Sequence, residues 1–197
     1  LSVTSSSNNA TYKIGDVIPV DVTFGAAVTV SGTPQLTLET GSSDAVVNYS
    51  SGSGGTTLTF NYTVASGHVS SDLDYASTSA LALNGGTIND ANGNPASITL
   101  AAMGQANSLG ANKALVIDGV VPTVTNVTST TSNGTLKVGD VAAITVTFSE
   151  AVTVNTSSGF PQLTLETGSA DAVVNYSSGS GGTTLTFNYT VASGHVS

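Results

Sequence analysis

The chain has 197 residues, of which 39% are hydrophobic and only 8% charged, and its 12 acidic residues against 3 basic ones give a net charge of −9. A partner such as nucleic acid, or insertion at an anionic membrane, is therefore excluded, because neutralising phosphate groups requires clustered basic side chains. The absence of cysteine excludes disulfides, thiolate zinc sites and a cysteine nucleophile.

The first part of the chain predicts short strands separated by turns. Leu1–Ser7 alternates loosely and is expected to be an edge strand. Val17–Phe24 alternates apolar and polar residues, as a half-buried strand does, and Pro19 places part of it at an edge. The clearest hairpin joins Asp44–Ser50 to Thr56–Val64 through a Gly-rich turn.

Residues 71–118 continue with shorter strands. They are expected at Leu81–Leu83, around Ile98 and Leu100, and at Ala114–Ile117, while Ala101–Ala106 is the one weak candidate for a helix. Many short strands with Gly-rich turns and almost no helix predict an all-β fold, an antiparallel β-sandwich of the immunoglobulin-like kind.

A long internal duplication sets the domain organisation. Pro34–Ser70 recurs as Pro161–Ser197 with a single change, Ala170 in place of Ser43. A repeat of this length is a whole domain, and not one supersecondary unit. We therefore predict a complete repeat at 1–118, a short stiff linker at 119–124, and a second repeat at 125–197.

The second repeat is truncated relative to the first, because nothing in it corresponds to residues 71–118. Half a sandwich would expose strand edges and an apolar face. Residues 71–118 could pair with either first half. We therefore expect neighbouring repeats of a longer protein, or identical chains by strand exchange, to be the partners.

An excess of carboxylates over cations favours hard metal ions, so calcium is the expected cofactor. Asp90, Asn92 and Asn94 place side-chain oxygens at alternate positions, as in the start of a calcium loop. Pro95 and Ala101 stand where an EF-hand has glycine and glutamate, so the loop is not an EF-hand. The alternative is a tight turn with no metal.

Other carboxylates extend this metal hypothesis. Asp118 and Glu150 each sit at a strand end near the predicted linker, and calcium would be favoured if they came near each other. Asp72 and Asp74 flank Leu73 and would point the same way in an extended segment. A solvated acidic turn is the simpler interpretation of this second pair.

A catalytic role finds little support in the sequence. His68 lies near several Ser and Asp residues, but there is no G-x-S-x-G elbow, and its repeat His195 lacks the corresponding aspartates. We therefore expect no enzyme activity. The tyrosines of the repeat, Tyr49 and Tyr62, offer an alternative sugar-stacking surface, although Tyr62 fits the inward alternation of its strand.

Strand and turn segments across the whole chain resemble the immunoglobulin-like tandem repeats of giant bacterial cell-surface adhesins of the RTX type. The segments that carry the resemblance are Val138–Val154, PQLTLETG, GTTLTFNYTVASGH, Asp72–Tyr75, Ala80–Asn94 and Ser108–Val124. These motifs are specific for a repeat type, and they indicate no single biochemical activity.

The resemblance implies an extracellular protein at the bacterial cell surface that acts in cell adhesion and biofilm formation. Its repeats would be extenders that hold a terminal binding domain, with its glycan or cell-surface ligand, away from the cell, rigidified by calcium at domain junctions. The chain departs from this pattern by having no glycine-aspartate nonapeptide, and the first repeat has Ala26 in place of Glu150. The alternative function is a carbohydrate- or cell-surface-binding β-sandwich module.

Overall fold

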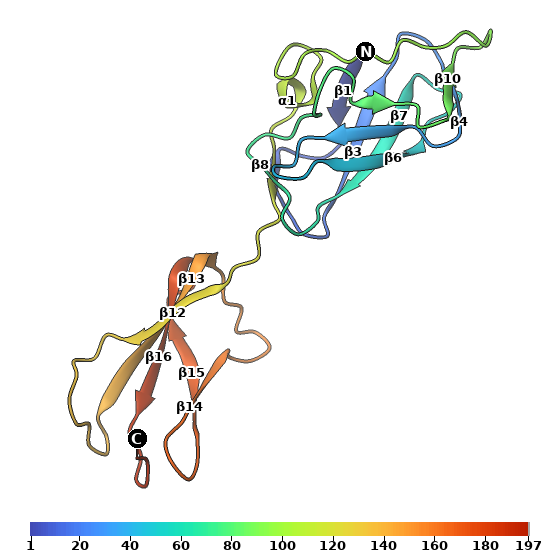
Figure 1. The fold of residues 1–197 in the computed structure, drawn as a ribbon. Helices are drawn as coiled ribbons and strands as arrows, with labels where there is room; N and C mark the ends of the chain where they lie inside the picture. The colour runs from blue at the N-terminus through green and yellow to red at the C-terminus, as the bar shows by residue number, and fades with distance from the viewer. Residues whose placement is uncertain (197) are drawn as a thin grey trace. The chain divides into compact units, whose positions relative to one another are not determined.

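The computed structural model describes residues 1–196 and contains two units, Leu1–Val121 and Pro122–Ser197, each with its own core. Nearly all regular structure is strand, and the predicted all-β fold with antiparallel sheets is confirmed (Figure 1). No helix among the described residues is long and apolar enough to cross a membrane. The boundary between the units falls within the predicted linker.

The main sheet of the first unit has the strand order β1-β3-β7-β6-β5-β9. Its strands are β1 (Ser2–Ser5), β3 (Val17–Thr23), β5 (Gln35–Leu38), β6 (Ala45–Ser51), β7 (Thr57–Thr63) and β9 (Leu81–Ala82). The predicted hairpin is present as β6 and β7, and β1 is the edge strand that the sequence indicates.

Alternation along β3 and β7 builds one wall of the core. Ile18, Val20 and Val22 are fully buried, while the residues between them face away from it. β1 pairs only with Val20–Thr23, so Pro19 lies beyond the paired part of this side of β3, as its missing N–H requires.

Two smaller sheets close the first unit. β2 (Ala10–Lys13), β11 (Leu115–Asp118) and β8 (Val69–Ser70) form one, and β4 (Thr29–Ser31) pairs with β10 (Thr87–Asn89) in the other. β11 runs parallel to β2 and antiparallel to β8, so this one contact departs from the expected antiparallel pairing.

The single described helical turn, α1, spans Leu109–Asn112 and begins where the Oγ of Ser108 accepts a hydrogen bond from Ala111 N. The helix expected at Ala101–Ala106 is wrong, because those residues form turns. Gly104 and Asn107 both have positive φ, which an α-helix does not accommodate.

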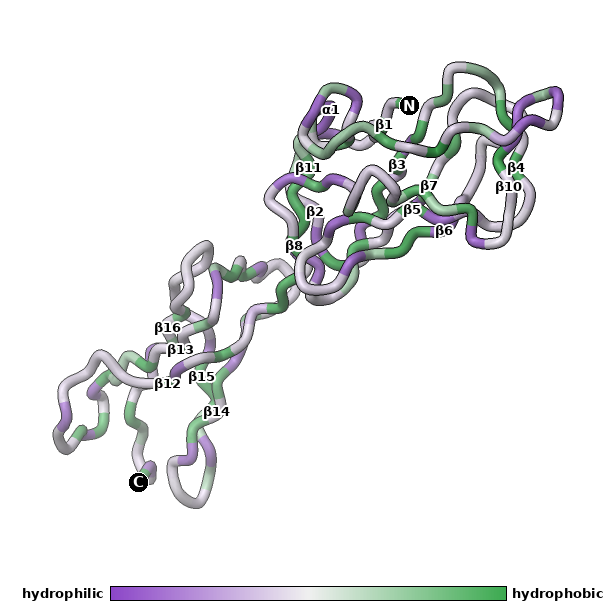
Figure 2. Tube along the Cα trace, turned by 45° about the horizontal axis from the view of Figure 1, so that its top comes forward, coloured by the Kyte–Doolittle hydropathy of each residue, from purple (hydrophilic) through white to green (hydrophobic). Residues whose placement is uncertain are grey.

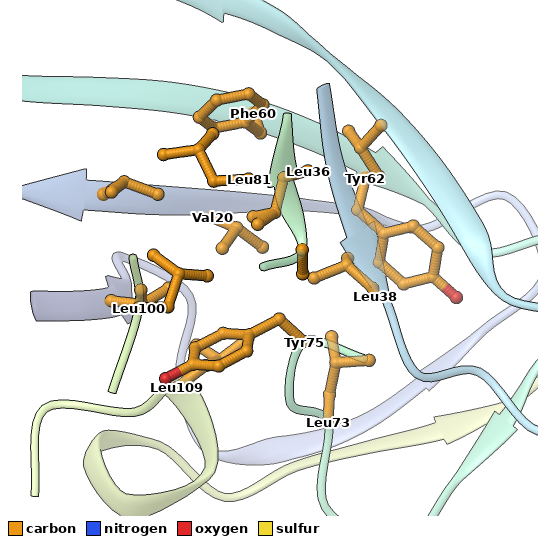
Figure 3. Packing of buried hydrophobic residues seen from close by; sticks show 14 of the residues in the cluster. Val20, Leu36, Leu38, Phe60, Tyr62, Leu73, Tyr75, Leu81, Leu100 and Leu109 are labelled. Carbon is orange, nitrogen blue, oxygen red and sulfur yellow. The ribbon is translucent and has the colours of Figure 1, made fainter. Parts of the chain in front are cut away.

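Side chains from the main sheet and from residues 71–118 meet in one core (Figure 3). Strands β3, β5 and β7 supply Val20, Leu36, Leu38, Phe60 and Tyr62, and residues 71–118, which include β9, supply Leu73, Tyr75, Leu81, Leu100 and Leu109. The hydropathy of the chain alternates along these strands, as burial of one face demands (Figure 2). The core therefore depends on both halves of the unit.

The second unit contains one sheet with the order β12-β13-β16-β15-β14. Its strands are β12 (Val124–Ser129), β13 (Val141–Val152), β14 (Gln162–Leu165), β15 (Ala172–Ser178) and β16 (Gly182–Thr190). Its hydrophobic core cluster consists of the buried residues Val146, Val174, Leu185 and Phe187.

This sheet repeats five neighbouring strands of the first unit's main sheet, β1-β3-β7-β6-β5, and has no counterpart of β9 among the described residues. Val141 pairs with Thr190 as Val17 pairs with Thr63, and a bulge follows Tyr176 as one follows Tyr49. These five strands thus have the same order and matching register in both units.

Candidate functional site

The loop after β10 is held together by Asp90. Its Oδ1 accepts hydrogen bonds from Asn92 N and Asn94 N, both at 2.8 Å, and its Oδ2 accepts one from Asn94 Nδ2 at 2.9 Å. These bonds, with those of Asn94 the largest, hold the pKa of the Asp90 carboxyl below its usual value. Gly93 has a φ of 86°, so the predicted tight turn is confirmed.

Both oxygens of Asp90 therefore already have protein donors. A calcium ion at Asp90 and Asn92 would have to share them with the loop's own N–H groups. Calcium at this loop stays a prediction.

The Asp72 and Asp74 carboxylates lie on the same side of their segment. A Cβ atom added to Gly110 would be 3.1 Å from Asp74 Oδ2 and 3.6 Å from Asp72 Oδ2. The expectation that the two carboxylates point the same way is confirmed.

Asp74 has a structural task that sequence reasoning missed. It accepts hydrogen bonds from the backbone N–H groups of Tyr75 at 2.9 Å, Gly104 at 3.1 Å and Leu109 at 3.2 Å. It therefore fastens the loop before α1 to the strand-like segment that contains Tyr75. The two loop donors lie 30 and 35 residues away in sequence, so no local pattern indicated them.

Asp118 belongs to the first unit and Glu150 to the second. Asp118 is the last residue of β11, and its Oδ1 accepts a hydrogen bond from Val120 N at 3.3 Å. Glu150 lies in β13, and its Oε1 is buried without a hydrogen-bond partner among the described residues. A carboxylate oxygen in that state is unusual in a folded protein.

Across residues 1–196, no three His, Asp or Glu side chains gather closely enough to form a metal cluster. A calcium site here would need backbone carbonyls, amide oxygens or water for most of its six to eight ligands. The carboxylates that the sequence singles out therefore stand singly or in pairs in this structure, and their binding of calcium stays a prediction.

Asp16 and Asp140 each follow a glycine in a turn before a strand, where a carboxylate usually accepts a hydrogen bond from a backbone N–H. Asp16 Oδ2 accepts a hydrogen bond from Lys13 N at 2.9 Å, and Asp140 Oδ2 accepts one from Lys137 N at 2.7 Å. Lys13 Nζ is 3.9 Å from Asp16 Oδ1 at the surface, a distance at which the ion pair contributes little.

The histidine of each repeat packs against a tyrosine. His68 Nδ1 lies 2.9 Å from Tyr62 Oη and accepts a hydrogen bond from Ala65 N, and the two rings stack with centroids 5.7 Å apart. Tyr189 and His195 repeat this contact at 2.8 Å and 5.8 Å. The hydroxyl of Tyr62 donates to His68, because Nδ1 already acts as an acceptor from Ala65.

Burial raises the pKa of Tyr62 to about 12. Burial, and then the negative charge of Asp74, raises the pKa of Tyr75 to about 12. The hydroxyl of Tyr75 donates to Ala101 O at 2.7 Å. Both phenols are core groups, as the inward alternation of Tyr62 predicts.

A shallow polar groove lies beside Tyr62 in the first unit and beside Tyr189 in the second. In the first unit its volume is about 500 Å³ and its lining includes Asn48, Tyr49, Asn61 and His68. The matching groove of the second unit has about 490 Å³ and is lined by the same residue types. No ligand-binding role was predicted for the Asn pair from the sequence, because each residue looks like an ordinary solvent-facing strand position.

Comparison with protein-family models finds no matching family, and comparison with curated proteins finds no relative of this chain.

Proposed function

We propose that the chain is a structural extender of a large bacterial surface adhesin. It would work outside the cell as a spacer that holds a terminal binding domain away from the surface, and it would perform no chemistry of its own.

The observation that carries this proposal is the repetition of one sheet. Five matching strands have the same order and register in both units, and three of them in each unit come from the nearly identical stretches 34–70 and 161–197. Repetition of a β-sheet adds length without adding a new site, which is what a spacer needs. The most chemically versatile side chain, the histidine, makes the same internal contact each time.

The proposal includes calcium as a stiffening ion. The buried, unpartnered Oε1 of Glu150 supports it, because a bound cation would satisfy that oxygen. Asp118, Asp90, Asn92, Asp72 and Asp74 are the other proposed ligands, each completed by carbonyls and water.

A labelled chain tests both parts of the proposal. The protein has no cysteine, so Val46→Cys and Val173→Cys, at exposed positions of the two units, place one spin label on each. Millimolar calcium should narrow the measured distribution of label distances and raise the unfolding temperature relative to EDTA. Glu150→Gln should reduce both responses.

If neither the distance distribution nor the unfolding temperature differs between calcium and EDTA, the calcium part is wrong. If the distribution also stays as broad as that of an unstructured linker, the spacer role fails with it.

A second candidate is a carbohydrate-binding module, and the paired polar grooves favour it. Each groove offers amide groups from two asparagines beside an aromatic ring, which is a typical surface for sugar hydroxyls. A glycan array with the intact chain tests it. If the intact chain retains a glycan and the double variant Asn48→Ala and Asn175→Ala does not, the carbohydrate-binding function replaces the spacer proposal.

A further inference from the structure

Matching residues are buried to different extents in the two units. Leu36 and Leu38 are 0% exposed, whereas Leu163 and Leu165, at the same places in the repeat, are partly exposed. Val3 is 0% exposed, and its counterpart Val127 is 54% exposed. The sheet is the same in both units, so the difference arises from what covers it.

In the first unit the cover is residues 71–118. Their buried side chains include Leu73, Tyr75, Leu81, Leu100, Leu109, Leu115 and Ile117. Their backbone also extends the main sheet, because Thr37 N donates to Ala80 O and Glu39 N donates to Asp74 O, both at 3.0 Å.

The second unit keeps the geometry of an acceptor for such a cover. Val196 N donates to Thr167 O at 3.0 Å, as Val69 N donates to Thr40 O at 3.0 Å. In the first unit this bond holds β8, the strand with which β11 pairs. In the second unit the same bond holds the matching segment at Val196. The acceptor frame therefore forms without the cover.

A hollow of about 600 Å³ marks the place of β11 in the second unit. We call it the acceptor groove; its lining includes Thr135, Leu136, Ile144, Leu165, Val191 and Val196. The matching positions in the first unit are Thr11, Tyr12, Val20, Leu38, Val64 and Val69. In that unit, β11 pairs with the strand that contains Thr11 and Tyr12, and with the strand that contains Val69.

We propose that the acceptor groove and the edge of β14 together bind a further segment with the sequence of residues 71–118. Its Leu115–Asp118 strand would lie parallel to residues 134–137 and antiparallel to Val196. Leu115 and Ile117 would fill the groove, and the residues equivalent to Asp74 and Ala80 would pair with the edge of β14. Backbone pairing would supply affinity, and the alternate apolar side chains specificity.

The occupant is an additional copy of this segment. The chain contains one copy, and the first unit buries it. If residues 71–118 moved from the first unit of one chain to the second unit of another, the first unit would lose its cover. Such an exchange would therefore bury no additional apolar area. This inference rests on packing alone and does not depend on the spacer role or on calcium.

The test is a titration of the intact chain with a synthetic peptide of residues 71–118, followed by amide hydrogen exchange. Exchange at residues 134–137, 162–166 and 191–196 should slow by about 100-fold at a peptide concentration of about 100 Kd. Amides of the first unit should be unchanged, because their cover is already in place.

A peptide with both Leu115→Asp and Ile117→Asp is the matched control, and it should give no protection. Equal protection by both peptides would contradict the proposal. A second result would also contradict it: a concentration-dependent dimer whose second unit is protected from exchange without peptide. The acceptor groove would then be covered by the same face of another chain, and not by residues 71–118.

A chain with residues 71–118 appended after Ser197 removes any difficulty with peptide solubility. The second unit of that chain should reach the exchange protection of the first. If its amides exchange as fast as in the original chain, the acceptor groove does not bind this segment.

Discussion

One carboxylate, that of Asp74, joins segments of the first unit that are far apart in sequence. Its bonds to Gly104 N and Leu109 N secure the loop that precedes α1, and its bond to Tyr75 N fixes its own orientation. Hydrogen bonds to a charged acceptor are among the stronger ones in proteins. The residue therefore acts as a structural anchor, whether or not it also binds a cation.

Replacement of this anchor should destabilise the first unit. Asp74→Ala leaves backbone N–H groups without their acceptor, so we expect a loss of about 2–3 kcal/mol in the free energy of unfolding. Urea denaturation measures it. Asp72→Ala, at the exposed neighbouring carboxylate, is the matched control and should change stability by less than about 0.5 kcal/mol. Similar losses in the two variants would contradict the anchor role.

The two core phenols predict an alkaline limit to stability. Their pKa values are raised to about 12 in the folded first unit, whereas unfolded tyrosine titrates near 10. A raised folded pKa gives stability that is complete below about pH 10 and is lost as the pH rises towards about 12. Thermal unfolding between pH 8 and pH 12 should show this decline.

The double variant Tyr62→Phe and Tyr75→Phe should remove most of this alkaline decline, although it is less stable at neutral pH. A variant with the same dependence on pH as the parent chain would show that other groups cause it.

A pair of equivalent leucines compares the two cores directly. Leu36→Ala opens a cavity in a closed core and should cost about 2–5 kcal/mol. Leu163→Ala removes a side chain that is already partly exposed and should cost about 1 kcal/mol or less. Urea unfolding, monitored separately for each unit by hydrogen exchange, measures both losses of unfolding free energy. Equal costs would mean that the second unit is as well covered as the first.

At the scale of elements, close backbone approach fixes the end of β11. Gly119 N donates to His68 O at 2.7 Å, and Gly119 O accepts from Gly67 N at 2.9 Å. A Cβ at Gly119 would collide with the carbonyl oxygens of Ala65 and His68. Only glycine fits where the chain leaves the first unit at this point.

Gly119→Ala should therefore destabilise the first unit by about 1–3 kcal/mol, because the backbone must shift to admit the methyl group. Gly25→Ala is the matched control, since a Cβ there meets nothing within 4 Å. Its unfolding midpoint should equal that of the parent chain or lie slightly above it. An unchanged midpoint for Gly119→Ala would mean that the contact is looser than it is in this structure.

Local periodicity predicts the main strands, because alternation in a segment such as Val17–Phe24 depends on neighbouring residues only. It cannot predict the parallel pairing of β2 with β11, whose partners are about a hundred residues apart and carry no shared local signal. The weak helix candidate at Ala101–Ala106 was wrong, because the capping Ser108 and the positive φ of Asn107 determine where the helix begins.

For the candidate site, the sequence predicts which carboxylates matter better than it predicts their hydrogen-bond partners. The turn at Asp90 was recognisable, since its donors lie within four residues. The anchoring role of Asp74 and the orphan oxygen of Glu150 depend on the tertiary fold, and the sequence carried no sign of either.

At the scale of the whole molecule, the described residues contain two matching sheets and one covering segment, which the first unit buries. Closure of the first unit leaves its counterpart with a small core, so the two units should differ in stability. The same duplication has a kinetic consequence. On the ribosome, residues 1–118 are complete before the second acceptor has been made, so synthesis from the N-terminus directs the segment to the first unit.

Refolding from urea has no such order, because both acceptors are present when the segment begins to dock. We expect refolded protein to contain a slowly converting fraction in which residues 71–118 lie on the second acceptor, and freshly synthesised protein to lack it. Hydrogen exchange of the two samples at Leu36 and Leu163 would distinguish them. In this chain, the order of docking during refolding would then differ from the order during synthesis.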